Sequence, residues 1–253
     1  MWYETYQVLT IGVVLTIGAV VQGAVGFAAG LISVPLLVLA NFSLPEAATI
    51  NLVSTSVQNG AGAWKLWSEL EPRELVYPVS ARLAGVPVGV WCLSLVDQLG
   101  VEWAKQMIGI LLLAIVVTLN VFRPQPRDRL GPFWSTAAFV SSGFLLGFAA
   151  IGGAPLVLYV NSLTWSAAKS RAFLFFCSIA AFPLMAVLVA WRFGSQVAPA
   201  AGAALAAMPL VFVGLWAGLK LGDRLDKQLF RRLTYALLTV IALASVAAPW
   251  LKP

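Results

Sequence analysis

Apolar segments follow one another along nearly the whole of this chain, each about as long as one bilayer crossing or somewhat shorter. Charged residues make up only 10% of the 253 residues, against roughly 25% in a soluble domain. The sequence therefore predicts an all-α integral membrane protein with 8–10 transmembrane or re-entrant helices. Ten segments can be distinguished, at about 6–22, 24–40, 47–67, 76–95, 103–122, 132–148, 149–162, 172–191, 197–219 and 231–251.

The residue types that are missing exclude several classes of function. Histidine is absent, and Cys92 and Cys177 stand in apolar surroundings without CxxC spacing. This removes most metal, redox and histidine-dependent catalytic sites, so we expect no metal site and no cofactor. The N-terminus MWYETYQ has no Lys or Arg, which argues against a cleaved signal peptide. The net charge of +6 is scattered through short loops, so no nucleic-acid partner is expected.

Lysine and arginine fall mostly on one side of the ten-segment count, and this bias indicates the orientation. Lys105, Arg192 and Lys252 fall on the other side. The positive-inside rule makes the richer side cytoplasmic, so we expect a multi-pass protein of the bacterial inner membrane with both termini periplasmic. The residues on the richer side are Lys65, Arg73, Arg82, Arg123, Arg127, Arg129, Lys169, Arg171, Lys220, Arg224, Lys227, Arg231 and Arg232.

A glycine-rich stretch occurs twice, which indicates an internal duplication. GFAA begins at Gly26 and again at Gly147, an offset of 121, and Pro35 and Pro155 are offset by 120. Five segments per half is an odd number, so the second copy enters from the opposite face. Such inverted repeats are common in secondary transporters. The predicted organisation is a first membrane repeat at 1–125, a short cytoplasmic linker at 126–131 and a second membrane repeat at 132–253.

Each repeat begins with two short segments that no polar loop separates, so each pair is either two thin spans or one re-entrant hairpin. Their glycines and prolines favour interrupted helices, with substrate bound near the membrane midplane where the halves meet. The alternative is that small residues only permit close packing of helices. The predicted helix breaks are Gly23, Gly26, Gly30, Pro35, Gly147, Gly152, Gly153 and Pro155.

These patterns resemble the TauE/SafE family of sulfite exporters over nearly the whole chain. The resemblance lies in the glycine-rich stretch that ends at Pro35, in the paired alanines Ala47 and Ala48, and in the second glycine set that ends at Pro155. It implies export of sulfite, sulfoacetate or a related organosulfonate by a transporter and not an enzyme. The expected partners are the small anion and the lipid bilayer, with a homo-oligomer left open.

An anion that crosses an apolar core needs positive charge or oriented N–H donors. Lys169, Ser170 and Arg171 stand where the helix over 172–191 should begin, and they form the leading candidate for the anion site. The alternative is that both cations only fix orientation.

The first repeat offers a neutral counterpart. With the offset of 120, Thr49 matches Lys169 and Asn51 matches Arg171. Gln58 and Gln22 are further candidates for the path, although polar side chains also join helices or cap backbone groups. Arg82 is a second candidate cation, about 9 Å into its segment, for which snorkelling to the interface is preferred.

Segments one to three and six to eight are expected to line the path, with the other four as a supporting shell. No Asp or Glu falls in the middle of a segment, so we expect facilitated export driven by voltage and the substrate gradient. The alternative is a channel, or a membrane subunit for another small anion that depends on a partner. No GxxxxGK[ST] loop is present for ATP, and no GxSxG for hydrolysis.

Overall fold

The computed structural model describes residues 3–25, 28–121, 125–224 and 227–250, with the side chains of 25, 222–224 and 227–231 left aside. Helices account for almost all of these residues, and no strand occurs among them. The α-helices are α1 (Thr5–Val25), α2 (Ala29–Leu39), α3 (Leu44–Lys65), α4 (Pro72–Leu99), α5 (Val101–Val121), α6 (Pro132–Ala149), α7 (Gly153–Asn161), α8 (Ala167–Phe193), α9 (Ala198–Ala206), α10 (Met208–Arg224) and α11 (Lys227–Ala247).

Within the described residues, six helices are long and apolar enough to cross a bilayer, namely α1, α4, α5, α6, α8 and α11. The pair α9 and α10 makes a seventh span if it is counted as one, with a bend of 54° between them. The multi-pass all-α membrane fold predicted from the sequence is confirmed. The ninth predicted segment, over 197–219, is corrected because two helices with different axes occupy it.

The short segments of the two halves form half-length helices. α2 has 11 residues and α7 has 9, so at 1.5 Å per residue they are about 16 and 14 Å long. Each follows a helix that does span, α1 or α6, and each is about half the apolar thickness of a bilayer. The paired segments are therefore one full span and one half-helix, neither two thin spans nor a simple hairpin.

Two close helix crossings join the halves, since α4 packs along α6 and α1 packs along α10. A Cβ atom at Gly89 of α4 would overlap the backbone of Phe144 and Phe148 on α6. Small residues let membrane helices approach closely and gain dispersion contacts where no hydrophobic effect drives them together. The glycines of these crossings include Gly85, Gly89, Gly143 and Gly147 between α4 and α6, and Gly23, Gly214 and Gly218 between α1 and α10.

Three of the predicted helix breaks need correction. Gly23 lies inside α1 and Gly147 inside α6, and each is packed against the backbone of the neighbouring helix. Pro35 lies inside α2, which continues through it. Gly30 is the second residue of α2, whereas Gly152 precedes α7 directly. Gly153 and Pro155 are in the first turn of α7, where proline costs little, and Gly26 lies outside the described residues.

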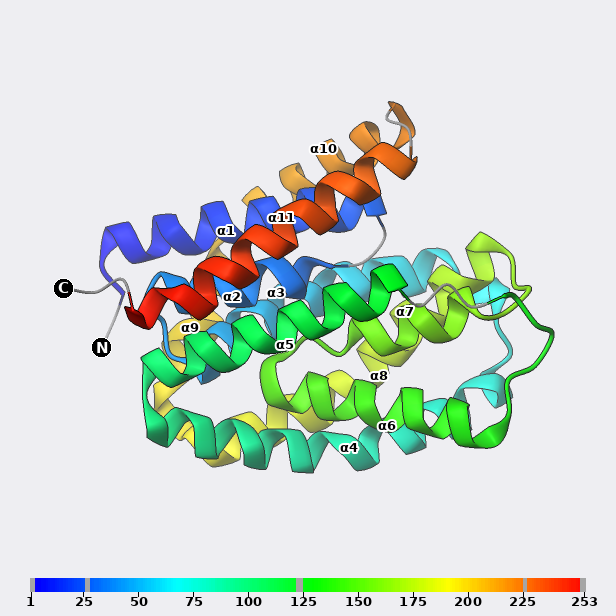
Figure 1. Ribbon diagram of the computed structural model, residues 1–253, viewed down its shortest axis with the longest axis horizontal. Helices are drawn as coiled ribbons and strands as arrows, with labels where there is room; N and C mark the ends of the chain where they lie inside the picture. Colours follow the sequence, from blue (N-terminus) through cyan, green and yellow to red (C-terminus); the bar gives the residue numbers. More distant parts are fainter. Residues whose placement is uncertain (1–2, 26–27, 122–124, 225–226, 251–253) are drawn as a thin grey trace.

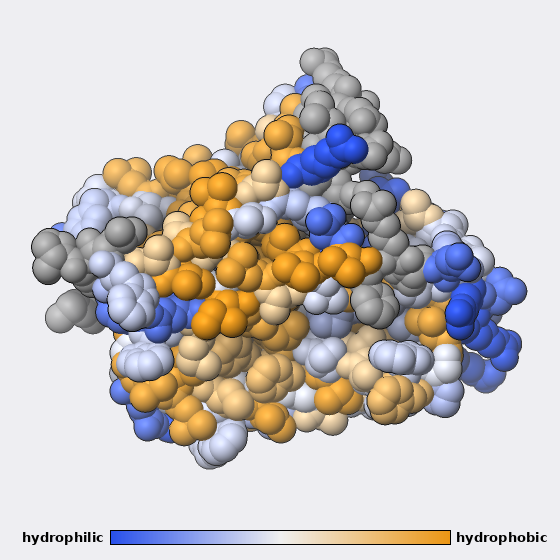
Figure 2. Space-filling view, viewed as in Figure 1, coloured by the Kyte–Doolittle hydropathy of each residue, from blue (hydrophilic) through white to orange (hydrophobic). Residues whose placement is uncertain are grey.

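The helices run along the long axis of the molecule, and α1 begins at the end where α11 finishes (Figure 1). Residues 125–131, which lead into α6, lie at the opposite end. Apolar side chains cover the middle of the face in Figure 2, and hydrophilic ones gather toward the helix ends. This distribution suits a bilayer whose normal follows the helices. Inversion of the second half, the boundaries of the halves and the side each end faces stay predictions.

Replacing Gly89 with alanine tests the glycine crossing. We expect Gly89→Ala to lower the free energy of unfolding by about 1–3 kcal/mol, because the new methyl group meets backbone atoms that cannot turn aside. Gly202→Ala in α9 is the matched control, since nothing lies within 4 Å of its Cβ position, and alanine should be neutral or slightly stabilising there. Thermal unfolding of the purified protein in detergent measures both, and equal midpoints would contradict the crossing.

Candidate functional site

A cavity of about 90 Å³ lies where the N-terminal ends of α2 and α7 meet α3, α4 and α8. Its volume far exceeds the roughly 10–15 Å³ that one water needs. The residues that line it are Gln22, Ala28, Ala29, Gly30, Leu31, Asn51, Leu52, Thr55, Ser56, Asn59, Arg82, Leu146, Ala150, Ile151, Gly152, Gly153, Ala154, Leu156, Val157, Leu174, Phe175 and Ser178. Arg82 is the one charged residue in this described lining.

Both half-helices present their N-terminal turns to the cavity. No side chain caps α2 at Ala28 or α7 at Gly152. The first N–H groups of a helix have no partner within it and carry the positive end of the helix dipole. Two such ends beside one cavity create a region of positive potential without charged side chains, which favours an anion.

Arg82 supplies a full positive charge at the same place. Its side chain is only 1% exposed, and Nε and Nη1 have no hydrogen-bond partner among the described residues. Its Nη2 atom lies 3.0 Å from the point that a Cβ on Gly152 would occupy. The described ion pairs, Lys105–Glu102 and Lys169–Glu74, leave this guanidinium without a carboxylate. A buried cation in this state is costly unless something pairs with it.

The expectation that Arg82 snorkels to the interface is wrong, and the start of its helix explains why. α4 begins at Pro72, four residues before the predicted segment, so Arg82 lies about 15 Å along the helix and not in its first turns. A capping box between Glu71 and Glu74 fixes this start. Glu71, Pro72 and Glu74 were the signal in the sequence that places it. Segment four, which was expected to belong to the supporting shell, contributes Arg82 to the lining of this cavity.

Asn51 faces the cavity from α3 and is fully buried. Its Nδ2 donates a hydrogen bond of 2.8 Å to the carbonyl oxygen of Ala150, while its Oδ1 has no partner among the described residues. Ala150 itself has a φ of 55°, an uncommon conformation for a residue with a Cβ. The hydrogen bond from Asn51 therefore holds the turn between α6 and α7 at the cavity wall.

Gly30 and Gly152 lie where the backbone comes closest to these polar groups. A Cβ on Gly30 would be 2.8 Å from Nδ2 of Asn51 and 3.0 Å from the Ala150 carbonyl oxygen. The Ser142 hydroxyl donates to the carbonyl oxygen of Gly152 and holds the other side of the turn. Any larger side chain at either glycine would occupy the space beside Asn51 or Arg82.

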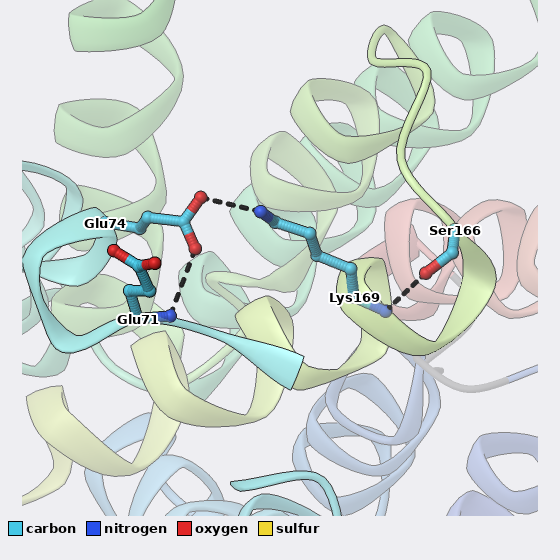
Figure 3. Close-up of polar contacts among 4 residues, drawn as sticks. All are labelled: Glu71, Glu74, Ser166 and Lys169. Atoms are coloured by element: carbon cyan, nitrogen blue, oxygen red, sulfur yellow. Dashed lines mark hydrogen bonds and ion pairs between the residues drawn. The ribbon is translucent and has the colours of Figure 1, made fainter. Parts of the chain in front are cut away.

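The leading candidates from the sequence lie elsewhere, at the start of α8. Nζ of Lys169 is 2.6 Å from Oε1 of Glu74, whose Oε2 accepts the backbone N–H of Glu71 (Figure 3). The hydroxyl of Ser166 already caps this helix by accepting the N–H of Lys169 (Figure 3). Arg171 is exposed and donates to the Ala167 carbonyl of its own helix. Ser170 is half-buried, and none of the three candidates lines the cavity.

The helix caps correct the register between the halves. Ser43 caps α3 and Ser166 caps α8 with the same backbone angles, which gives an offset of 123 residues instead of 120. Asn51 then matches Leu174, not Arg171, and both of these residues line the cavity. Thr55 and Ser178 match in the same way. The caps thus give Asn51 a different counterpart from Arg171, which the offset of 120 predicted.

The other predicted polar candidates divide between the cavity and the helix interior. Gln22 lines the cavity from α1. Thr49 donates to the carbonyl of Pro45 within α3, and Gln58 donates to the carbonyl and hydroxyl of Ser54. Neither Thr49 nor Gln58 is among the described residues that line the cavity. Ser142 and Ser178 were missed, since single serines in apolar helices give no signal in the sequence.

A family model described as sulfite exporter TauE/SafE matches residues 10–245 of the chain. No curated protein and no solved structure matches the chain.

Replacing Arg82 with methionine tests whether the charge of Arg82 destabilises the fold. We expect Arg82→Met to raise the free energy of unfolding by about 1 kcal/mol or more, because methionine keeps an apolar stem and removes an unpaired buried charge. Unfolding should be followed in a buffer whose only anion is the large gluconate ion. A fall in stability would show instead that the guanidinium holds the fold together.

Proposed function

The chain belongs to the sulfite exporter TauE/SafE family, and on that premise we propose that it exports a small sulfur oxyanion through the cavity beside Arg82. Members of this family are membrane transporters of sulfite or related anions, and this chain is a multi-pass membrane protein. The cavity lies among interrupted helices, as substrate sites of secondary transporters commonly do. The substrates considered are sulfite, sulfoacetate and related organosulfonates.

The observation that carries this proposal is the unpaired guanidinium of Arg82 at the cavity wall. An ionisable group deep within a membrane protein is rare and marks a functional site by default. Among the described residues no carboxylate forms an ion pair with it, and Nε and Nη1 have no hydrogen-bond acceptor. A transported anion would supply the missing charge and accept the hydrogen bonds from Nε and Nη1.

The remaining lining sets how tightly an anion is held. The N-terminal turns of α2 and α7 add donors and partial positive charge, while α3 and α8 present neutral side chains such as Asn51 and Ser178. A site with one full cation can bind an anion and still release it, which transport requires.

The energy for export comes from the membrane potential and the substrate gradient. An inside-negative potential favours outward movement of an anion by about 2.3 kcal/mol per charge per 100 mV. Proton- and sodium-coupled carriers often use buried carboxylates or histidines, and the cavity lining contains neither in the described residues. We place the protein in the bacterial inner membrane with both termini periplasmic, working without a cofactor and without a partner protein.

Flux of radioactive sulfite into proteoliposomes tests the role of Arg82. We expect Arg82→Gln to lower the flux at least tenfold, since hydrogen bonds from a charged donor are worth about 1.5–3 kcal/mol. Arg171→Gln is the matched control and should stay within about twofold of wild type, because its guanidinium is exposed and satisfied on its own helix. The reverse pattern would place the anion site at the start of α8. Absence of wild-type flux would favour a subunit that depends on a partner.

The same vesicles test the driving force. With potassium and valinomycin setting the voltage, we expect the equilibrium distribution of a monovalent substrate to shift about 50-fold per 100 mV, which is 2.3 kcal/mol expressed as a ratio. Protein-free vesicles of the same lipid measure the leak of the bilayer itself. A requirement for a proton or sodium gradient at fixed voltage would contradict facilitated export.

A further inference from the structure

We propose that the cavity selects a singly charged oxyanion that carries a hydrogen-bond donor, and that Oδ1 of Asn51 accepts the hydrogen bond from this donor. For sulfur oxyanions the species is hydrogen sulfite and not the sulfite dianion. This inference rests on the proposed function and names the form of substrate that the same site takes.

The orientation of the Asn51 amide follows from its contact with Ala150. A backbone carbonyl oxygen only accepts hydrogen bonds, so the atom that lies 2.8 Å from it must be the amide nitrogen. The amide oxygen is thereby turned away from Ala150, and it has no partner in the described residues. Asn51 is 0% exposed, so bulk water does not satisfy this oxygen. A buried acceptor without a donor costs free energy comparable to a lost hydrogen bond.

Arg82 lines the same cavity and has hydrogen-bond donors that lack acceptors. Its Nε and Nη1 are donors without acceptors, whereas Oδ1 of Asn51 is an acceptor without a donor. A ligand with acceptor oxygens alone satisfies Arg82 and leaves Asn51 unpaired. A ligand that satisfies both residues has anionic oxygens at one end and an O–H or N–H group at another.

The charge of the lining indicates a monoanion. Arg82 contributes one positive charge, and the described lining contains no further Lys or Arg to balance a second negative charge. A dianion would depend on the partial charges of the α2 and α7 N-termini for its second negative charge, whereas Arg82 alone balances a monoanion, so the monoanion is favoured in a medium of low dielectric constant. Hydrogen sulfite has one negative charge and one dissociable proton, whereas sulfite has two charges and no donor. A cavity of about 90 Å³ suits an ion of this size.

Three tetrahedral ions of similar size allow the effect of an ion's charge on binding to be distinguished from the effect of its hydrogen-bond donor. Sulfamate and methanesulfonate are both monoanions, but the amino group of sulfamate donates hydrogen bonds and the methyl group does not. Sulfate has two charges and no donor at neutral pH. We expect sulfamate to inhibit sulfite flux through the wild-type protein at a concentration about tenfold below that of methanesulfonate, with sulfate the weakest. Equal inhibition by the two monoanions, or strongest inhibition by sulfate, would overturn the inference.

Asn51→Leu tests the residue assigned to the donor. In this variant we expect the preference for sulfamate over methanesulfonate to fall to within about twofold, because the acceptor is gone. Asn59→Leu is the matched control, since Asn59 lines the same cavity from α3, and it should keep the preference. An unchanged preference in Asn51→Leu would show that a group other than Asn51 accepts the hydrogen bond from the ligand. The comparison of ions in the wild-type protein stands even if a variant does not fold.

The pH dependence of sulfite binding gives an independent readout in detergent, through stabilisation against thermal unfolding. The affinity per total sulfite should rise as the pH falls and hydrogen sulfite replaces the dianion, while methanesulfonate, whose charge is constant, serves as the reference. Binding that weakens relative to methanesulfonate on acidification would contradict the inference and leave the proposed function standing. If neither sulfite nor any of the three probe ions binds, the proposed function itself fails.

Discussion

The energetic cost of an unpaired charge in an apolar interior is the constraint on which the other features of this molecule depend. Arg82 is buried inside the helix bundle without a carboxylate partner in the described residues. A guanidinium there destabilises the fold unless an anion, water or oriented dipoles compensate it. The uncapped N-termini of α2 and α7 add positive potential at the same point, which raises the repulsion and favours an anion even more strongly. Such an arrangement is unfavourable for stability and suited to binding, as functional sites often are.

The glycine crossings explain how the chain holds a charge at this depth. α4 carries Arg82 and packs so closely on α6 that a Cβ atom on Gly143 would overlap the carbonyl oxygen of Arg82. α6 ends at Ala149, the next residue Ala150 accepts the hydrogen bond from Asn51, and α7 starts at Gly153 beside the guanidinium. One crossing thus positions the cation, the turn and the start of the half-helix together.

The general architecture could be predicted from the sequence, because a bilayer requires long apolar helices and these are visible in the composition. The interrupted helices were also indicated by the glycines, and Gly152 and Gly153 lie at such an interruption. The site was harder to predict, since it depends on which way a helix face points and where the helix starts. Arg82 looked like an interfacial residue because α4 begins in polar sequence at Pro72. Lys169 and Arg171 looked like an anion site because the sequence does not show what they bind. Lys169 pairs with Glu74, which is distant in the sequence, and Arg171 donates to the Ala167 carbonyl of its own helix.

Locating a bound anion tests the central claim most directly. Selenite is the selenium analogue of sulfite, and its electron-rich selenium can be identified by anomalous scattering in crystals of the protein. The account predicts one selenium position in the cavity, with selenite oxygens within hydrogen-bond distance of Nε and Nη1 of Arg82 and close to the first turns of α2 and α7. Selenium bound only near Lys169 and Arg171, with the cavity unchanged at saturating selenite, would contradict it.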